Sequence, residues 1–204
     1  GTFNGPTGID FDAQGNLIVA DSGNHSIRQI SPDGTITTVA GTSGMSGGQN
    51  GNPSQAQFDN PLDVAISTSG TIYVVDSDNN AIRRIRFLSS GTLVDVLVGN
   101  TNASPGFVNA NGSSARFNKP TALVIDDNED IYVTDRMNST VRKITSNGDV
   151  STINQSNQSG FVDGPLTVAR FNTPNGIETD GSGNLYISDS GNNVIRFVQF
   201  PSQP

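Results

Sequence analysis

Residues 3–30 read FNGPTGIDFDAQGNLIVADSGNHSIRQI, and the same pattern returns three more times along the 204-residue chain. The later copies are FDNPLDVAISTSGTIYVVDSDNNAIRRI (58–85), FNKPTALVIDDNEDIYVTDRMNSTVRKI (117–144) and FNTPNGIETDGSGNLYISDSGNNVIRFV (171–198), and all four align without an internal gap. An opening Phe, a Pro three residues later, an Asp and an Arg recur together at intervals of 54 to 59 residues. Such self-similarity is the sequence signature of a repeat architecture.

Each copy contains short runs of apolar residues, called apolar pulses below. The runs are rich in β-branched residues, which are typical of strands. In the first copy, three pulses lie within residues 9–30 and a fourth lies at 36–39. The segments between them, at 12–16, 21–24 and 31–34, carry the Asp, Asn, Gly and Pro that tight turns require. No stretch shows a sustained 3.6-residue apolar period. One repeat is therefore predicted to be a four-stranded antiparallel meander.

A single four-stranded sheet cannot hide both its faces, whereas sheets stacked radially around an axis cover one another. The sequence therefore predicts an all-β fold, a β-propeller whose blades have four antiparallel strands, over residues 1–204 as one domain or segment. The four repeats are placed at about 3–41, 58–99, 117–153 and 171–200. The last repeat is expected to lack its outer strand, because the sequence stops soon after its third apolar pulse.

The repeated motif resembles the NHL repeat. It has an apolar strand, an Asp, an Asn three residues later and an Arg four residues after that, and Asn24-His25 supplies two letters of the family's name. The resemblance implies propeller blades of the NHL type. It implies no single function, because the family includes protein- and RNA-binding modules, receptor sensor domains, extracellular proteins and a minority of metal-dependent lyases or hydrolases.

The repeated Asp and Arg lie seven residues apart, at the end of the second predicted strand and within the third. We expect the Asp to cap its turn through an Asx-turn and to meet the guanidinium across the strand pair. All four copies are alike, so the pairs are interpreted as structural. The pairs are Asp21 and Arg28, Asp76 and Arg83, Asp135 and Arg142, and Asp189 and Arg196.

No catalytic residue is assigned. His25 is the only histidine, so the three-histidine zinc site of NHL-like amidating lyases cannot be built from this sequence. The string Gly44-Met45-Ser46-Gly47-Gly48 matches a nucleophile elbow by letter but lacks the strand-to-helix context.

Calcium is the one cofactor the sequence offers ligands for, because related propellers hold a central Ca²⁺ with carboxylates of their innermost strands. Four residues after the repeated Pro stand Asp10, Ala65, Val124 and Glu178. Two repeats thus place a carboxylate where the other two are apolar, and this asymmetry makes Asp10 and Glu178 candidate metal ligands. No other cofactor is expected.

The net charge and the composition of the chain limit the classes of partner that the sequence predicts. A formal net charge of −8 opposes binding to a phosphate backbone, so nucleic acid is not an expected partner. No apolar run is long enough to span a bilayer, so membrane insertion is not expected. Only 15% of residues are charged, while Gly, Asn, Ser and Thr are abundant. This composition favours an extracellular or cell-surface location.

Three long Gly-, Asn- and Ser-rich connections, at 42–57, 100–116 and 154–170, should share one face of the disc. The leading hypothesis is a non-enzymatic binding or structural assembly module that uses these loops and its exposed strand edges. Its expected partners are proteins, including copies of itself in a homo-oligomer or filament, unless the chain is part of a longer polypeptide. The alternative is a calcium-dependent propeller hydrolase or lyase.

Overall fold

The computed structural model describes residues 2–154 and 157–200, and these form four antiparallel sheets, the blades of a β-propeller. The predicted all-β fold is confirmed. The first blade contains β1 (Pro6–Phe11), β2 (Leu17–Asp21), β3 (Ser26–Ile30) and β4 (Ile36–Ala40), and the second contains β5 (Pro61–Ile66), β6 (Ile72–Asp76), β7 (Ala81–Leu88) and β8 (Gly91–Gly99). The third contains β9 (Pro120–Ile125), β10 (Ile131–Asp135), β11 (Thr140–Ile144) and β12 (Val150–Thr152), and the fourth contains β13 (Pro174–Thr179), β14 (Leu185–Asp189) and β15 (Val194–Val198).

The helical elements of the described chain are single 3₁₀ turns, none of them long or apolar enough to cross a membrane. They are η1 (Ser22–Asn24), η2 (Gly112–Ser114), η3 (Arg136–Asn138) and η4 (Ser190–Asn192). The fourth blade has three strands in the described residues, as its sequence predicts.

The same backbone conformations recur from blade to blade. The turn between the first two strands uses a left-handed residue at Gly15, Gly70 and Gly183, with φ between 80° and 84°. Glu129 occupies this position in the third blade at φ 62°, a conformation that glycine adopts at less cost. The turn before the third strand also ends on a left-handed residue in every blade; these residues are His25, Asn80, Ser139 and Asn193.

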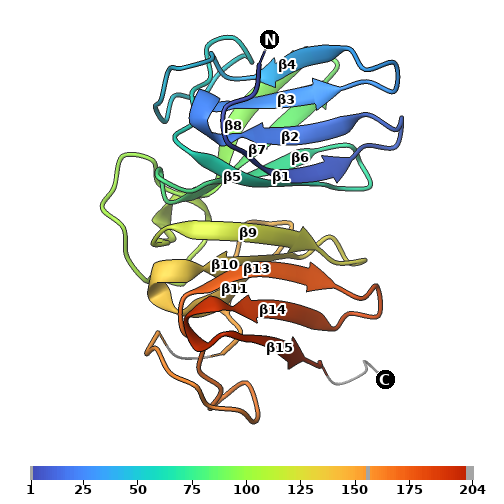
Figure 1. The fold of residues 1–204 in the computed structure, drawn as a ribbon. Coiled ribbons are helices and arrows are strands. Elements are labelled where there is room, and N and C mark those ends of the chain that lie inside the picture. The colour runs from blue at the N-terminus through green and yellow to red at the C-terminus, as the bar shows by residue number, and fades with distance from the viewer. Residues whose placement is uncertain (1, 155–156, 201–204) are drawn as a thin grey trace.

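The first strand of each blade lies innermost, next to the first strand of the following blade: β1 beside β5, β5 beside β9, and β9 beside β13. Figure 1 shows the first two blades in the upper half of the molecule and the last two in the lower half. The long connections lie at the left edge in this view, and the short hairpins between the first two strands of each blade lie at the right.

The core consists of three apolar clusters, one between each pair of successive blades. We call the side of a blade that packs on the next blade its forward face, and the opposite side its backward face. Between the first two blades, forward-face Ile18 and Ile27 pack with backward-face Val64 and Val74 and with Phe58. The same pairing of faces builds the other two clusters.

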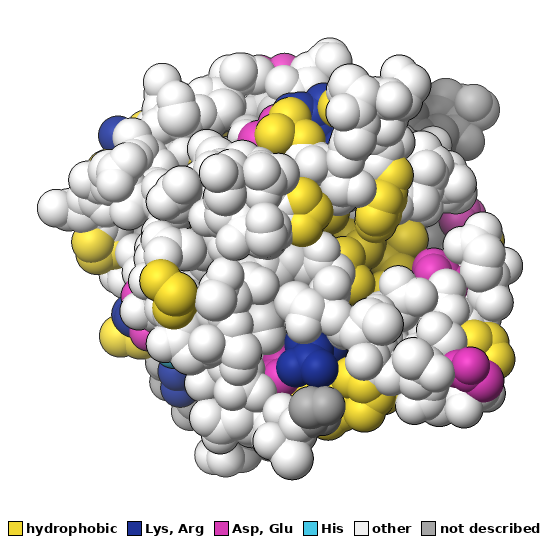
Figure 2. Space-filling view, turned by 90° about the horizontal axis from the view of Figure 1, so that it is seen from above, with side chains coloured by type: hydrophobic (Ala, Val, Ile, Leu, Met, Phe, Trp, Pro, Cys, Tyr) yellow, Lys and Arg dark blue, Asp and Glu magenta, His cyan; other side chains and the backbone are white. Residues whose placement is uncertain are grey.

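The surface on the side where β4 lies is mainly uncharged. Seen from the side on which β4 lies, charged side chains are few and scattered, and hydrophobic side chains gather in a hollow (Figure 2). This appearance agrees with the low content of charged residues in the sequence.

Candidate functional site

The repeated Asp and Arg meet as ion pairs inside the blades. The Asp and Arg atoms lie 2.9 Å apart for Asp76–Arg83, 2.8 Å for Asp135–Arg142 and 3.0 Å for Asp189–Arg196, but 3.6 Å for Asp21–Arg28. All eight side chains are buried. Burial raises the pKa of Asp76 and Asp135, and the guanidinium of the partner arginine opposes that rise.

The expected Asx-turn is wrong. Each Asp instead accepts the backbone N–H of the residue that follows the repeated Phe, for example Asp59 to Asp76 at 2.7 Å. The other carboxylate oxygen of Asp76 accepts the side-chain amide of Asn79 and the guanidinium of Arg83. The Asp therefore ties the entry of its own blade to the turn, in which the N–H groups of Asp78 and Asn80 donate to backbone carbonyls.

The Arg of each later blade holds the long connection that leads into that blade. Arg83 donates to the carbonyl of Gln49 and to Asn50 Oδ1 at 2.9 and 2.8 Å. Arg142 donates to the carbonyl of Val108 and to Asn109 Oδ1 at 2.9 and 2.7 Å. Sequence reasoning missed this role, because the contacts join residues 33 or 34 positions apart.

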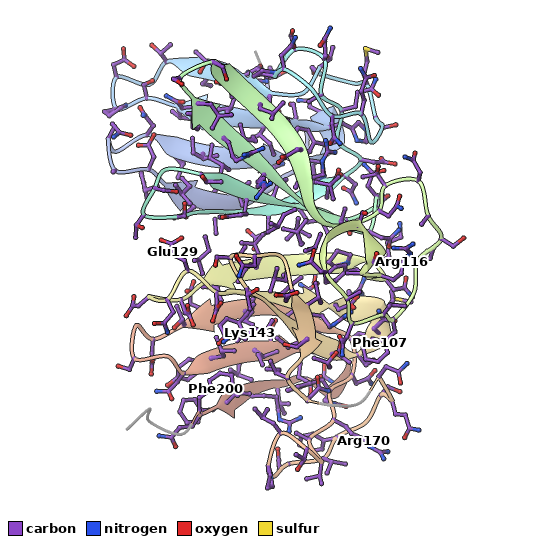
Figure 3. All side chains as sticks on the ribbon, turned by 180° about the vertical axis from the view of Figure 1, so that it is seen from behind. Phe107, Arg116, Glu129, Lys143, Arg170 and Phe200 are labelled. Carbon is purple, nitrogen blue, oxygen red and sulfur yellow. The ribbon has the colours of Figure 1, made fainter. Side chains whose placement is uncertain are left out.

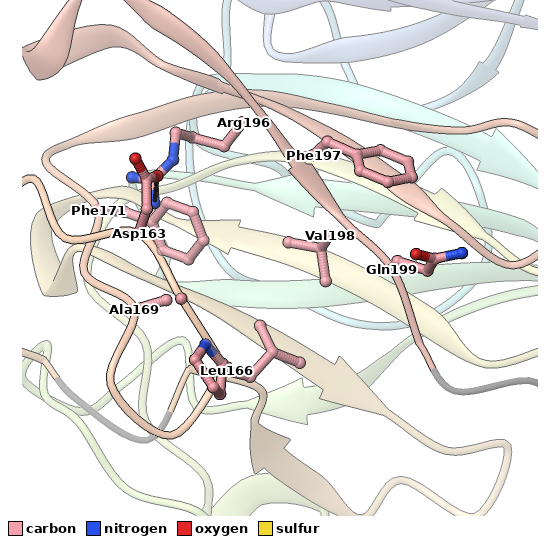
Figure 4. A pocket seen from close by; sticks show the side chains of 10 residues that line it. Asp163, Leu166, Ala169, Phe171, Arg196, Phe197, Val198 and Gln199 are labelled. Carbon is pink, nitrogen blue, oxygen red and sulfur yellow. Dashed lines mark ion pairs between the residues drawn. The ribbon is translucent and has the colours of Figure 1, made fainter.

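The third connection is held in the same way, within its described residues 157–170. Arg196 donates to the carbonyl of Val162 at 2.8 Å and pairs with Asp163 at 2.7 Å. Figure 4 shows Arg196 beside Asp163 and Phe171, with Leu166 and Ala169 of the connection nearby. These residues border a small cavity of about 230 Å³.

Aromatic rings complete each anchor. The guanidinium of Arg83 lies 5.2 Å from the centre of the Phe58 ring. The guanidinium of Arg142 lies between two rings, 5.0 Å from the centre of Phe107 and 4.9 Å from the centre of Phe117. Arg196 has the corresponding Phe161 and Phe171 at 5.3 and 5.1 Å. Cation–π contacts of this kind add to the ion pairs and fix the plane of the guanidinium.

The anchored connections form what we call the loop face, composed of residues 42–57, 100–116 and 157–170. In Figure 3 the labelled Phe107, Arg116 and Arg170 lie along this edge, and Glu129 lies at the opposite one. Each connection exposes an apolar side chain: Met45, Val108 and Val168 are 51%, 44% and 52% exposed. The arrangement can present apolar contacts from a rigid support.

A second candidate site lies on the axis, where the structure brings the predicted Asp10 and Glu178 to one cavity of about 230 Å³. A third carboxylate, Asp63, lines the same cavity. Burial raises the pKa of Asp63 to about 6, and the nearby charges of Asp10 and Glu178 act in the same direction.

The axial carboxylates are engaged with backbone donors. Asp10 accepts the N–H of Ile66 at 2.8 Å, and Asp63 accepts the N–H of Leu123 at 3.0 Å, so each links its inner strand to the next. Glu178 accepts the N–H of Thr179. Across the described residues, no three His, Cys, Asp or Glu side chains group closely enough to hold a metal ion.

Comparison with known proteins supports the repeat assignment. The family model described as NHL repeat matches residues 3–30, 58–85 and 117–144. The chain is 24% identical to Protein SUPPRESSOR OF QUENCHING 1, chloroplastic, of Arabidopsis thaliana, over 96% of the chain and 19% of that protein. It is 30% identical to human NHL repeat-containing protein 3, over 58% of the chain and 30% of that protein.

Among solved structures, an auxiliary nutrient binding protein from Bacteroides ovatus superposes with a TM-score of 0.74 at 24% identity. The match covers 97% of the chain and 49% of that structure, so the chain spans about half the length of this relative and less of the curated ones. At this identity the likeness shows the fold alone.

Proposed function

Because the chain is an NHL-repeat β-propeller, we propose that it acts as a non-enzymatic binding module at an extracellular or cell-surface location. The observation that carries the proposal is the loop face, where three long connections are each held by a buried arginine and each expose an apolar side chain. Anchored loops lose little conformational entropy on binding, so their apolar contacts contribute more fully to affinity. Proteins are the partner class that such a surface fits.

The test probes protein and glycan arrays with the labelled chain. The loop-face variant Met45→Ser/Val108→Ser/Val168→Ser should lose the signals that the native chain gives. A matched control is Phe87→Ser/Leu88→Ser, which removes two exposed apolar side chains, 60% and 43% accessible, from the β7–β8 hairpin. Array signals that survive the loop-face substitutions would contradict the proposal. Protease treatment of intact source cells tests the location, since a surface protein is cleaved without lysis.

A calcium-dependent hydrolase or lyase is the second candidate, and the three carboxylates around the axial cavity favour it. A bound ion would raise the melting temperature by mass action. We expect no saturable rise on adding CaCl₂, because the axial oxygens already accept backbone N–H groups. If calcium raises the melting temperature and Glu178→Gln abolishes that rise, the calcium-dependent enzyme becomes the better candidate and the binding module the second.

The proposal includes association of the module with copies of itself, as expected from its strand edges. β15 is the outermost strand of the fourth blade, and no strand of the described residues pairs with its free edge. An unpaired edge offers backbone donors and acceptors to another chain. Sedimentation of the purified chain over the micromolar range tests this part of the proposal.

A further inference from the structure

We propose that a cavity between the first two blades, beside their short hairpins, binds a tyrosine side chain of a partner protein. The cavity has a volume of about 550 Å³, which lies within the range of ligand-binding pockets. Its walls belong to two described blades that pack on each other. The hairpins lie on the side opposite the long connections (Figure 1), so the inference adds a second binding site to the module and does not use the loop face.

The cavity follows from one difference between the repeats. The second strand of each later blade carries a tyrosine as its second residue, namely Tyr73, Tyr132 and Tyr186, and the first blade has Ile18 there. Tyr73 and Tyr132 pack in the apolar clusters that join their blades to the next. An isoleucine is shorter than a tyrosine by most of a ring, and Ile18 is the buried floor of the cavity.

The interface between the third and fourth blades shows the same place filled. The Tyr132 ring lies 5.7 Å from the Phe200 ring, centre to centre, and Lys143 Nζ lies 5.5 Å from the centre of the Tyr132 ring. The Tyr132 hydroxyl donates to Asp126 Oδ2 at 3.4 Å, in the turn that precedes its own strand. A tyrosine side chain here meets an aromatic ring of the next blade, and a long polar side chain and a carboxylate of its own blade.

The cavity between the first two blades keeps the aromatic wall of this arrangement. Phe87 has the repeat position of Phe200, and Gln29 has that of Lys143. Both line the cavity, and Phe87 is 60% exposed. Paired aromatic rings are favourable beyond the area that they bury. A ring that enters the cavity would therefore gain with Phe87 the contact that Tyr132 makes with Phe200.

The cavity also keeps the hydrogen-bond acceptor. Asp12 has the repeat position of Asp126, and Oδ1 of each accepts two backbone N–H groups of its own turn, so the two carboxylates have the same orientation. Asp12 lines the cavity. Its Oδ2 accepts Asn16 Nδ2 at 2.7 Å, and a carboxylate oxygen can accept a second donor. The hydroxyl of a tyrosine is the donor that Asp126 receives, so the same group suits Asp12.

The wall formed by the β5–β6 hairpin is held by the third blade. Glu129 Oε1 accepts the backbone N–H of Thr68 at 3.0 Å and also accepts its hydroxyl. Thr68 lines the cavity. Glu129 stands where the other blades have glycine and adopts the left-handed conformation at φ 62°, so the third blade accepts backbone strain at the residue that holds this wall. A wall that is already held in place loses less conformational entropy when a ligand binds.

The experiment follows the amide signals of the full chain by NMR while acetyl-Gly-Tyr-Gly-amide is added. The signals of residues 66–70, which line the cavity, should shift saturably. A single ring gives a dissociation constant on the order of 1 mM, too weak for array signals, so this test is separate from the test of the loop face. Acetyl-Gly-Phe-Gly-amide lacks the hydroxyl and should bind about threefold more weakly or worse. p-Cresol, which is the free side chain, should bind no more tightly than the tyrosine peptide.

Two substitutions at one position give the decisive comparison. Ile18→Tyr places a ring of the chain itself in the cavity, as in the later blades, and should abolish the shifts that the peptide causes. Ile18→Leu keeps the space and should bind the peptide as the native chain does. If the tyrosine variant fails to fold, Phe87→Ser removes the aromatic wall and should weaken binding about threefold or more. Circular dichroism checks the folding of each variant.

Four results would overturn the inference. They are a native chain whose residues 66–70 do not respond, shifts that persist in folded Ile18→Tyr, equal binding of the two peptides, and binding of p-cresol without binding of the tyrosine peptide. The last result would assign the cavity to a free phenol. The loop-face variant should bind the tyrosine peptide as the native chain does, so failure of the loop-face proposal would leave this result unchanged.

Discussion

Asp63 places a carboxylate near the axis at a position where the other three blades have small residues. It occupies a repeat position where the other blades carry Gly8, Ala122 and Gly176. A Cβ added at Gly8 would lie 2.1 Å from an Asp63 carboxylate oxygen, so the glycine makes room for the carboxylate. Burial then outweighs the hydrogen bonds from Leu123 and Val64, and the pKa of Asp63 rises to about 6.

The pKa of Asp63 predicts that Asp63→Asn gains stability relative to the native chain as the pH rises. The folded chain holds the Asp63 proton up to about pH 6, whereas the unfolded chain releases it near 3.8. Raising the pH through this window therefore costs the native chain stability that the Asn variant does not lose. We expect a relative gain on the order of 2 kcal/mol between about pH 4 and pH 7, measured by urea unfolding.

The control for this measurement is Asp33→Asn. The Asp33 carboxylate is exposed, and the backbone N–H of Thr35 holds its pKa below the usual value. Its pH dependence should therefore have the opposite sign, because ionised Asp33 favours the folded chain at higher pH. A pH-independent difference between Asp63→Asn and the native chain would contradict the raised pKa.

The axial site could be predicted in part. Asp10 and Glu178 stand out because two repeats carry a carboxylate where the others are apolar, and the structure does place both on the axial cavity. Asp63 was missed because it lies two residues earlier in its strand. An aspartate among Gly, Ala and Gly at one repeat position was the available signal. The N–H groups of Ile66 and Leu123, which donate to Asp10 and Asp63, come from neighbouring blades, and spacing within one repeat cannot reveal such contacts.

Among the elements, the strands were predictable and the role of the connections was not. The short apolar pulses and turn residues give four strands in a repeat, and the fourth blade has three in the described residues. The pairing of each Asp with its Arg also follows from the seven-residue spacing. The hold of Arg83 on Gln49 and Asn50 depends on where a long connection returns, and sequence periodicity does not determine that return.

The anchoring of connections predicts unequal costs for two matched substitutions. Arg83→Met should destabilise the chain by about 3–5 kcal/mol, because it leaves Asp76 buried without its cation and removes the hold on residues 42–57. Arg28→Met should cost less, since Arg28 lies 3.6 Å from Asp21 and makes its described side-chain hydrogen bond to Thr37 within the blade. Urea unfolding measures both changes.

Hydrogen exchange distinguishes the loss of the hold on residues 42–57 from the loss of the Arg83–Asp76 ion pair. In Arg83→Met, the amide of Gly47, which donates to the carbonyl of Phe58, should exchange faster than in Arg28→Met. Equal destabilisation by the two substitutions, with unchanged exchange at Gly47, would show that the arginine supports the blade alone and does not position the loop.

At the scale of the whole molecule, the four blades of the described residues are joined by three interfaces, and each packs a forward face on a backward face. The order of the blades fixes this direction, since each blade offers its forward face to the blade that follows it. This property belongs to the arrangement of repeats and not to any single residue.

Charge gives the proposed self-association a predicted salt dependence. Each copy carries a formal net charge of −8, so copies repel one another at low ionic strength. The proposed contact pairs the uncharged backbone groups along the free edge of β15, so salt does not screen the contact itself. Screening of the net charge should therefore strengthen association about threefold or more between roughly 0.02 and 0.3 M NaCl. Sedimentation equilibrium measures the change. If salt instead dissociates the native assembly, ion pairs carry the contact and the strand edge does not.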